Sequence, residues 1–177
     1  GELKNDAAQQ WLFNSFAIAN TIKAGRNMKE RILFEEIPSG AEFAQVVVDA
    51  MQQNRVLFVD YKPFKGEKFE LYLQPFAMRV YNQRWYVVGR FKESGKIRNI
   101  ALDRILRMEI TEEEFSLPED FDAHDYYSHT VGIFVNEALK PQRVVLRTFG
   151  VSTEYMRTVP LHPSQHEIAT NGDEYSD

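Results

Sequence analysis

The feature that most constrains the fold of this chain is a change in its hydrophobic period near residue 55. Between Arg55 and Ile110, apolar and polar side chains alternate in short runs that are separated by turn-forming residues. A period of two indicates β-strands that turn one face toward a core. Five or six such runs in fewer than 60 residues, joined by tight turns, predict a small antiparallel β-barrel.

Turns and breaks divide this stretch into individual strands. Residues 62–66 and 82–83 are typical of turns, and Pro75 with Phe76 is expected to interrupt the ladder of hydrogen bonds. The strands predicted in this way are Val56–Tyr61, Lys68–Leu73, Met78–Tyr81, Arg84–Phe91, Lys96–Leu102 and Ile105–Ile110. The side chains expected in the barrel core are Trp85, Val87, Ile100 and Leu102.

Helices are expected ahead of these strands. Residues 1–25 carry a wide apolar stripe at helical spacing, and residues 31–37 form a short strand or an extended link. Ser39 and Glu42 have the spacing of a capping box, in which each side chain accepts a hydrogen bond from a free backbone amide of the first turn. Apolar residues at helical spacing behind it predict a helix over residues 39–51.

Beyond the strands the sequence is acidic and less regular. Residues 111–125 are typical of a linker, residues 143–149 of a strand, and residues 152–157 of one helical turn begun by a Ser cap. We therefore expect an α+β chain in four parts: a helical connector over residues 1–51, the barrel over 52–112, an acidic linker over 113–125 and a partial C-terminal α/β segment over 126–177.

Charge is distributed unevenly along the chain, whose 177 residues carry a formal net charge of −5. Residues 52–110 hold twelve Lys and Arg against six Asp and Glu, a net charge of +6, whereas residues 111–177 hold four against thirteen, a net charge of −9. A basic segment inside an acidic chain indicates either an anionic partner or docking of that segment on the chain's own acidic tail. The charge pattern alone leaves both interpretations open.

Several classes of function lack their sequence signals. The chain has no cysteine, so disulfides and thiolate metal sites are excluded, and no G-x-S-x-G, G-x-x-x-x-G-K-[ST] or G-x-G-x-x-G pattern occurs. His162 and His166 have zinc-ligand spacing, but Pro163 lies between them and no acidic third ligand accompanies them. We therefore expect no enzyme, no cofactor and no metal site. Apolar runs too short to span a membrane and the lack of a secretion leader make a cytoplasmic location the expectation.

Arginines recur at strand positions of the basic segment. On strict alternation, Arg98 and Arg104 flank an apolar pair on one face of one strand, while Tyr86 and Arg90 share a face of the preceding strand. An arginine close to a core requires either a carboxylate partner or an anionic ligand. The candidate internal partners are Asp60, Glu70 and Asp103.

The most distinctive stretch of the chain contains the triplet Trp85-Tyr86-Val87. Further characteristic positions surround it: an upstream aromatic residue, a proline about ten residues ahead of the triplet, and an Arg-x-x-x-Leu-Asp-Arg-Ile block, which are here Tyr61, Pro75, Arg98, Leu102, Asp103, Arg104 and Ile105. This pattern resembles the WYL domain, which is named for a Trp-Tyr-Leu triplet, with Val in place of Leu in this chain. The helix over residues 39–51 and the stretch 155–166 resemble the flanks of that domain, so the similarity covers nearly the whole chain.

The resemblance implies a fold and a function beyond what the residues themselves establish. WYL proteins are mostly bacterial transcriptional regulators with a winged helix-turn-helix, an Sm/SH3-like barrel and a C-terminal α/β extension, and many are homodimers. By resemblance, this chain is a ligand-sensing module that binds an anionic ligand, single-stranded nucleic acid or a nucleotide, and relays occupancy to a DNA-binding domain. Promoter DNA would be contacted only through a winged helix-turn-helix, which the 177 residues do not show.

The residues expected to contact the ligand combine aromatic rings with cations. Stacking is assigned to Tyr61 and Tyr86, and contact with phosphates to Arg79, Arg90, Arg98 and Arg104. Trp85 is expected in the core instead. The alternative is an oligomerisation or protein-docking scaffold, in which the basic face is paired internally or with an acidic partner surface.

Overall fold

The computed structural model describes residues 40–136, 138–171 and 175–176. All of these residues belong to the unit that comprises residues 38–177. The predicted helix over residues 1–25 and the predicted strand or link over residues 31–37 lie outside the described residues. Within the described part of the chain, no helix is long and apolar enough to cross a membrane.

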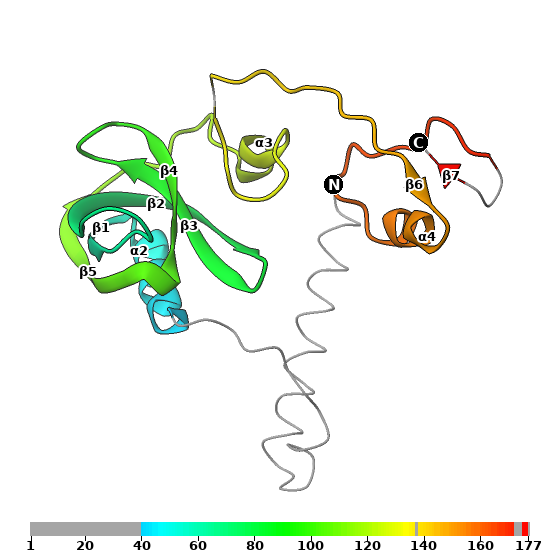
Figure 1. Ribbon diagram of the computed structural model, residues 1–177. Coiled ribbons are helices and arrows are strands. Elements are labelled where there is room, and N and C mark those ends of the chain that lie inside the picture. The colour runs from blue at the N-terminus through cyan, green and yellow to red at the C-terminus, as the bar shows by residue number, and fades with distance from the viewer. Residues whose placement is uncertain (1–39, 137, 172–174, 177) are drawn as a thin grey trace, which may run out of the picture. The chain divides into compact units, whose positions relative to one another are not determined.

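Five strands form one antiparallel sheet (Figure 1). They are β1 (Arg55–Tyr61), β2 (Phe69–Tyr81), β3 (Arg84–Phe91), β4 (Ile97–Ala101) and β5 (Ile105–Glu114). The spatial order is β4-β3-β2-β1-β5, so the last two strands in sequence lie at opposite edges, and the short 3-10 helix η2 (Leu102–Arg104) connects them. The predicted antiparallel strands are confirmed, but barrel closure is not, because no ladder joins β4 to β5 among the described residues.

A bulge in β2 replaces the predicted break at Pro75 and Phe76. Pro75 pairs with Gly89 and Ala77 with Val88, so Phe76 is an extra residue without a partner of its own on β3. The missing N–H of proline is tolerated at such an irregularity, and the ladder continues beyond it. The two strands predicted on either side of Pro75 are therefore one strand of 13 residues.

The core of the sheet lies on its inner face, where helix α2 (Ala44–Gln53) packs against β1, β2 and β5. Val47 and Ala50 of α2 are completely buried there. The predicted core is confirmed: three of its members are buried in this cluster and Trp85 packs against it. The buried side chains that this cluster draws from the strands and η2 are Leu57, Val59, Tyr61, Leu71, Leu73, Val87, Ile100, Leu102, Ile105 and Met108.

The start of the helical segment differs in detail from the predicted capping box. A 3-10 turn, η1 (Ala41–Phe43), precedes α2, and the carboxylate of Glu42 accepts a hydrogen bond from the backbone N–H of Gly40 at 2.8 Å. Ser39 lies outside the described residues. Gly40 has a φ of +105°, and a Cβ there would lie 2.4 Å from the backbone nitrogen of Asp103. Only glycine therefore allows η1 to approach η2 this closely.

Residues 115–136, called the strap below, follow β5 and lie against the outer face of the sheet (Figure 1). Phe115 is buried with Val56 and Phe76 in a second apolar cluster, and Phe121 packs against it. Helix α3 (Ala123–Tyr127) is capped by Asp122, whose carboxylate accepts hydrogen bonds from the backbone N–H groups of residues 124 and 125. These two bonds, from residue 125 first, hold the pKa of Asp122 below its ordinary value.

The C-terminal part contains β6 (Thr148–Phe149), α4 (Val151–Thr158) and β7 (Tyr175–Ser176). The predicted strand over residues 143–149 is wrong except at its end, because residues 143–147 pair with no strand among the described residues. The predicted helical turn is confirmed and is longer, but Gly150 occupies its N-cap in place of a serine. Arg157 bonds both Glu154 and Glu167 and so ties α4 to the chain that follows it.

Candidate ligand-binding surface

The outer face of β2 and β3 brings three of the predicted ligand residues to one side of the sheet. Arg79 and Tyr86 are direct cross-strand neighbours, and Arg90 lies further along the same face of β3. The guanidinium of Arg79 lies 4.1 Å from the ring centre of Tyr127 in the strap. Arg90 lies over the ring of Phe76 at 5.4 Å. Both cations therefore contact aromatic rings.

Arg98 and Arg104 do not share one face of one strand, and this prediction is corrected. Strand β4 ends at Ala101, and Arg104 belongs to the 3-10 helix η2, where strict alternation no longer applies. Arg98 is paired with Gly89 and Ile97 with Arg90, so Arg98 has the opposite parity to Arg90. Tyr86, Arg90 and Arg98 therefore do not form a single row of alternating rings and cations.

Arg104 forms a separate cluster at η2. Its guanidinium stacks on the exposed ring of Phe64, with 3.7 Å between the guanidinium carbon and the ring centre. The guanidinium carbon of Arg84 lies 5.7 Å from the centre of the same ring. Arg84 also forms an ion pair with Asp103, with 3.3 Å between Nε and Oδ2. Buried atoms of all three charged residues, Nε of both arginines and Oδ1 of Asp103, lack a hydrogen-bond partner. Phe64 thus combines an open ring face with an adjacent cation.

Tyr61 and Tyr86 are both largely buried, each 6% exposed. The ring of Tyr61 lies in the inner core beside Phe69, and its hydroxyl accepts a 3.5 Å hydrogen bond from the backbone N–H of Ala101. The stacking role predicted for these two tyrosines stays a prediction. Phe64 is an exposed aromatic residue next to Arg84 and Arg104, and its place in a turn gave no sequence signal.

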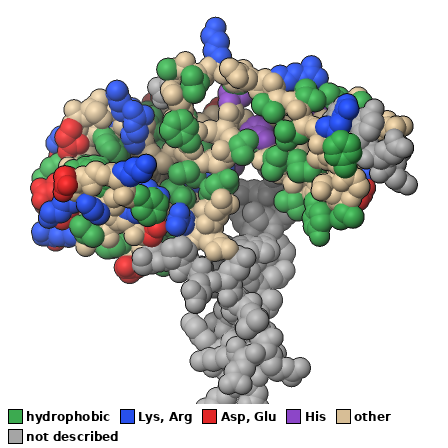
Figure 2. All heavy atoms as spheres, in the orientation of Figure 1, with side chains coloured by type: hydrophobic (Ala, Val, Ile, Leu, Met, Phe, Trp, Pro, Cys, Tyr) green, Lys and Arg blue, Asp and Glu red, His purple; other side chains and the backbone are tan. Residues whose placement is uncertain are grey.

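The cations of the sheet divide into paired and unpaired groups. Arg55, Lys92 and Arg107 form ion pairs with glutamates of β5. Figure 2 shows such Lys and Arg side chains next to Asp and Glu over this part of the chain. Among the described residues, no carboxylate pairs with the four predicted phosphate contacts, Arg79, Arg90, Arg98 and Arg104. Nη1 of Arg79 and Nε of Arg104 are buried without a hydrogen-bond partner.

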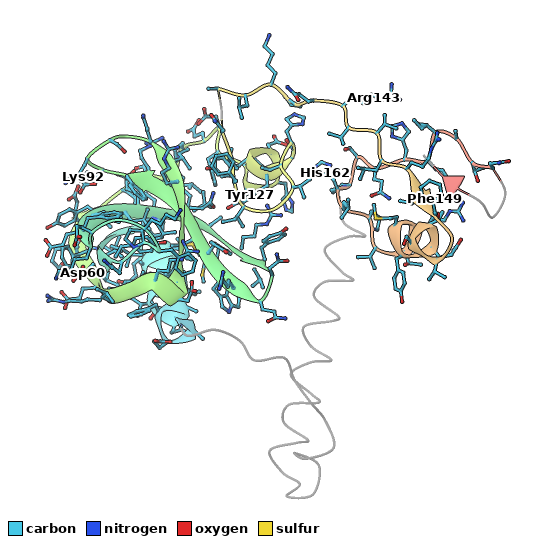
Figure 3. The ribbon with its side chains drawn as sticks, in the orientation of Figure 1. Asp60, Lys92, Tyr127, Arg143, Phe149 and His162 are labelled. Atoms are coloured by element: carbon cyan, nitrogen blue, oxygen red, sulfur yellow. The ribbon has the colours of Figure 1, made fainter. Side chains whose placement is uncertain are left out.

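The strap is tied to the outer face through Asn99 of β4. Its side chain accepts a hydrogen bond from the hydroxyl of Tyr127 and donates one to the backbone carbonyl of Ile133 at 2.9 Å. Figure 3 shows Tyr127 on α3, beside the sheet. Burial raises the pKa of Tyr127 to about 12, and the neighbouring Tyr126 adds to this effect while Arg79 opposes it. The sequence interpretation divided the strap between the predicted linker over residues 113–125 and the predicted C-terminal segment over 126–177, and it missed the contact of Tyr127 with Arg79.

Between β4 and the strap lies a groove of about 460 Å³, whose lining includes Arg98, Asn99, Tyr126, Phe134 and Asn136. Another hollow, of about 440 Å³, is formed by residues 141–168 of the C-terminal part. His166 is part of its lining, and both His162 and His166 lie outside helices and strands and contact Ser164. No group of potential metal ligands is present among the described residues.

The sequence comparison identifies the class of domain that carries these residues. Residues 42–110, which include α2 and the five strands up to Ile110, match the family model of the WYL domain. The match covers less than half of the chain. A search of curated proteins found no match.

A solved structure with some similarity is "Proteasome accessory factor B/C (PafBC) of Arthrobacter aurescens". The sequence identity is 22% and the TM-score 0.43, and the match covers 46% of this chain. It spans 13% of the length of PafBC.

Proposed function

We propose that this chain is the ligand-sensing module of a bacterial transcriptional regulator. Its WYL domain binds an anionic ligand, single-stranded nucleic acid or a nucleotide, and relays occupancy to a DNA-binding domain. The observation that carries the proposal is a set of arginines that pair with no carboxylate in the described part of the chain, Arg79, Arg90, Arg98 and Arg104. A guanidinium that stacks on a ring keeps N–H donors at its edge, which suit phosphate oxygens.

The pairing of the other cations argues for the same function. Arg55, Lys92 and Arg107 are neutralised by glutamates of β5, as expected for the form of the scaffold alternative in which the basic face is paired internally and not with an acidic partner. Internal carboxylates are thus close at hand in this sheet, yet the four arginines do not use them. A scaffold with an internally paired basic face leaves these four without an explanation, whereas an anionic ligand provides one.

Binding of a labelled single-stranded oligonucleotide, followed by fluorescence anisotropy at several salt concentrations, tests the proposal. We expect binding that weakens as salt rises, because each neutralised phosphate releases a counterion. Arg104→Ala should weaken binding and lower the log–log salt slope by about 0.7. Phe64→Ala should weaken binding with little change of slope, because stacking releases no ions.

Arg107→Ala is the matched control, since its guanidinium is paired with Glu109 at 2.7 Å. It should leave both affinity and slope nearly unchanged. No binding by the wild-type chain even at low salt would contradict the proposal, and so would an Arg107 effect as large as the Arg104 effect. Tyr61→Ala is a poor probe of stacking, because it removes a ring from the inner core and so lowers stability.

The homodimer that the WYL resemblance implies is tested separately by analytical ultracentrifugation.

A further inference from the structure

We propose that the groove between β4 and the strap is a nucleotide-binding site, in which Arg98 contacts the phosphate and Phe134 stacks on the base. This inference rests on the proposed function and assigns its ligand to one place in the molecule. The groove holds about 460 Å³, which is within the range of sites for small ligands of about 300–1,000 Å³. That size suits one nucleotide better than an extended strand.

The charge of the groove favours an anion. Among the described residues that line the groove, Arg98 is the single charged one, although the strap itself is acidic. The carboxylates of the strap, at Glu119, Asp120, Asp122 and Asp125, are absent from that lining. Arg98 lines the groove from the edge strand β4, although its parity is opposite to that of Asn99. Within the described part of the chain its guanidinium makes one hydrogen bond, of 3.5 Å to the backbone carbonyl of Ile97, so other donors remain for a phosphate.

The rings of the groove supply the second half of nucleotide recognition. Phe134 is 73% exposed, and it lines the groove together with Tyr126. An exposed aromatic face beside an arginine is the combination on which a nucleobase stacks while its phosphate is neutralised. Asn136 adds an amide to the same lining, and its Oδ1 is held by the backbone N–H of Ala138 at 3.0 Å.

The wall of the groove is fixed by hydrogen bonds that leave the proposed contacts free. Asn99 is engaged on both sides of its amide, by Tyr127 and by the carbonyl of Ile133, so it positions the strap rather than the ligand. The residue after Ile133 is Phe134, and the tether therefore holds the stacking ring next to β4. Asn99 is a positioning residue in this arrangement.

Calorimetric titration with AMP and with a short 5′-phosphorylated single-stranded oligonucleotide tests the site and separates two sources of the same chemistry. Binding of AMP alone identifies a free nucleotide as the ligand, and binding of the oligonucleotide without AMP identifies a strand end. In either case Arg98→Gln and Phe134→Ala should each weaken the bound probe about tenfold, through loss of a charge-assisted hydrogen bond or of a stacked ring. Phe134→Tyr should bind like wild type.

Matched controls are Arg107→Gln, for an exposed but paired arginine, and Phe149→Ala, for an exposed ring outside the groove. Both control variants should bind like wild type. Because Arg98 and Phe134 are exposed, Arg98→Gln and Phe134→Ala should keep the wild-type unfolding midpoint. If Arg98→Gln and Phe134→Ala bind normally while Arg104→Ala still weakens the oligonucleotide, the groove is not the site and the proposed function stands. If wild type binds neither probe, the proposed function itself is overturned.

Discussion

At the scale of single residues, the arginines of this sheet show how a cation can be held without being neutralised. Arg104 stacks on Phe64 and Arg79 on Tyr127, at 3.7 and 4.1 Å from the ring centres. A ring attracts the guanidinium face but offers no acceptor to the N–H groups at its edge. An ion pair such as that between Arg107 and Glu109 uses those donors. The two kinds of partner therefore distinguish arginines that stack on a ring from arginines whose donors are used by a carboxylate.

Gly89 illustrates how little space the β2 bulge leaves. A Cβ at this position would lie 2.2 Å from the carbonyl oxygen of Gln74 and 2.9 Å from a methyl group of Leu73. We expect Gly89→Ala to lower the free energy of unfolding by about 2–3 kcal/mol, because the two strands must move apart. Denaturant unfolding followed by circular dichroism measures the loss.

Gly95→Ala provides the comparison for this prediction. Gly95 has a φ of +67° and nothing within 4 Å of a Cβ, so alanine there meets backbone strain without a clash. Its expected loss is about 1 kcal/mol. Equal losses for the two variants would show that β2 and β3 are not in close contact at Gly89.

At the scale of elements, the pattern of alternation predicted the strands well because each depends on local sequence. The alternation pattern failed where contacts between distant parts of the chain determine the local structure. Pro75 lies within β2 because a bulge accommodates it, and residues 102–104 leave the strand conformation to form η2 between the two edges of the sheet. The acidic character of residues 113–125 concealed Phe115 and Phe121, which pack on the sheet. Such packing has no local signature, since the partner residues lie far away in sequence.

The strap offers a test through its buried phenol. Burial raises the pKa of Tyr127 from 10.0 to about 12, so the folded state favours the protonated form. The contribution of this phenol to strap docking is complete below about pH 10 and is lost as the pH rises toward about 12. Absorbance of tyrosinate during an alkaline titration should show a late component that Tyr127→Phe removes.

Tyr155→Phe is the control for that titration, because the ring of Tyr155 is exposed on α4. The late component should persist in this variant. A wild-type curve that superimposes on the Tyr127→Phe curve, apart from its amplitude, would mean that the strap does not bury the phenol. Hydrogen exchange at residues 123–127 should rise over the same pH interval once the intrinsic pH dependence is subtracted.

At the scale of the whole molecule, a basic sheet is followed by acidic chain. Residues 52–110 carry +6 and residues 111–177 carry −9, so long-range repulsion opposes the approach of a polyanion while local arginines attract it. Glu119 and Asp120 are exposed in the strap. The double variant Glu119→Gln/Asp120→Asn should speed association of a single-stranded oligonucleotide several-fold at low salt.

That acceleration should vanish at about 1 M salt, where charges separated by more than about 3 Å are screened. Stopped-flow fluorescence at two salt concentrations measures it. Dissociation should change little, since neither residue lines the groove. An effect on dissociation alone would place these carboxylates in contact with the ligand. Lys140→Gln, which also alters a charge outside the groove, should slow association instead.

The candidate site could be predicted from the sequence only in part. Residue types and charge selected the arginines, and none of the four pairs with a carboxylate among the residues that the structure describes. Their distribution over separate places depends on register and on η2. Arg98 was selected without Phe134, which lines the same groove from 36 positions further along the chain. A pattern within one strand carries no information about which distant loop lies across its edge.

The bulge at Phe76 adds one residue to β2 and so shifts, by one position, which of the following side chains point inward and which point outward. Upstream of it, Leu71 and Leu73 lie on the inner face, and downstream Met78 packs inward while Arg79 is freed to face outward. Deletion of Phe76 would restore strict alternation from Leu73 onward and leave Met78 on the inner face and Arg79 on the outer face, because the residues beyond the bulge keep their partners on β3. We therefore expect the deletion variant to stay soluble with Arg79 on the outer face, and to lose stability mainly through the ring contacts of Phe76 with Phe115 and Phe121, which Phe76→Leu also removes.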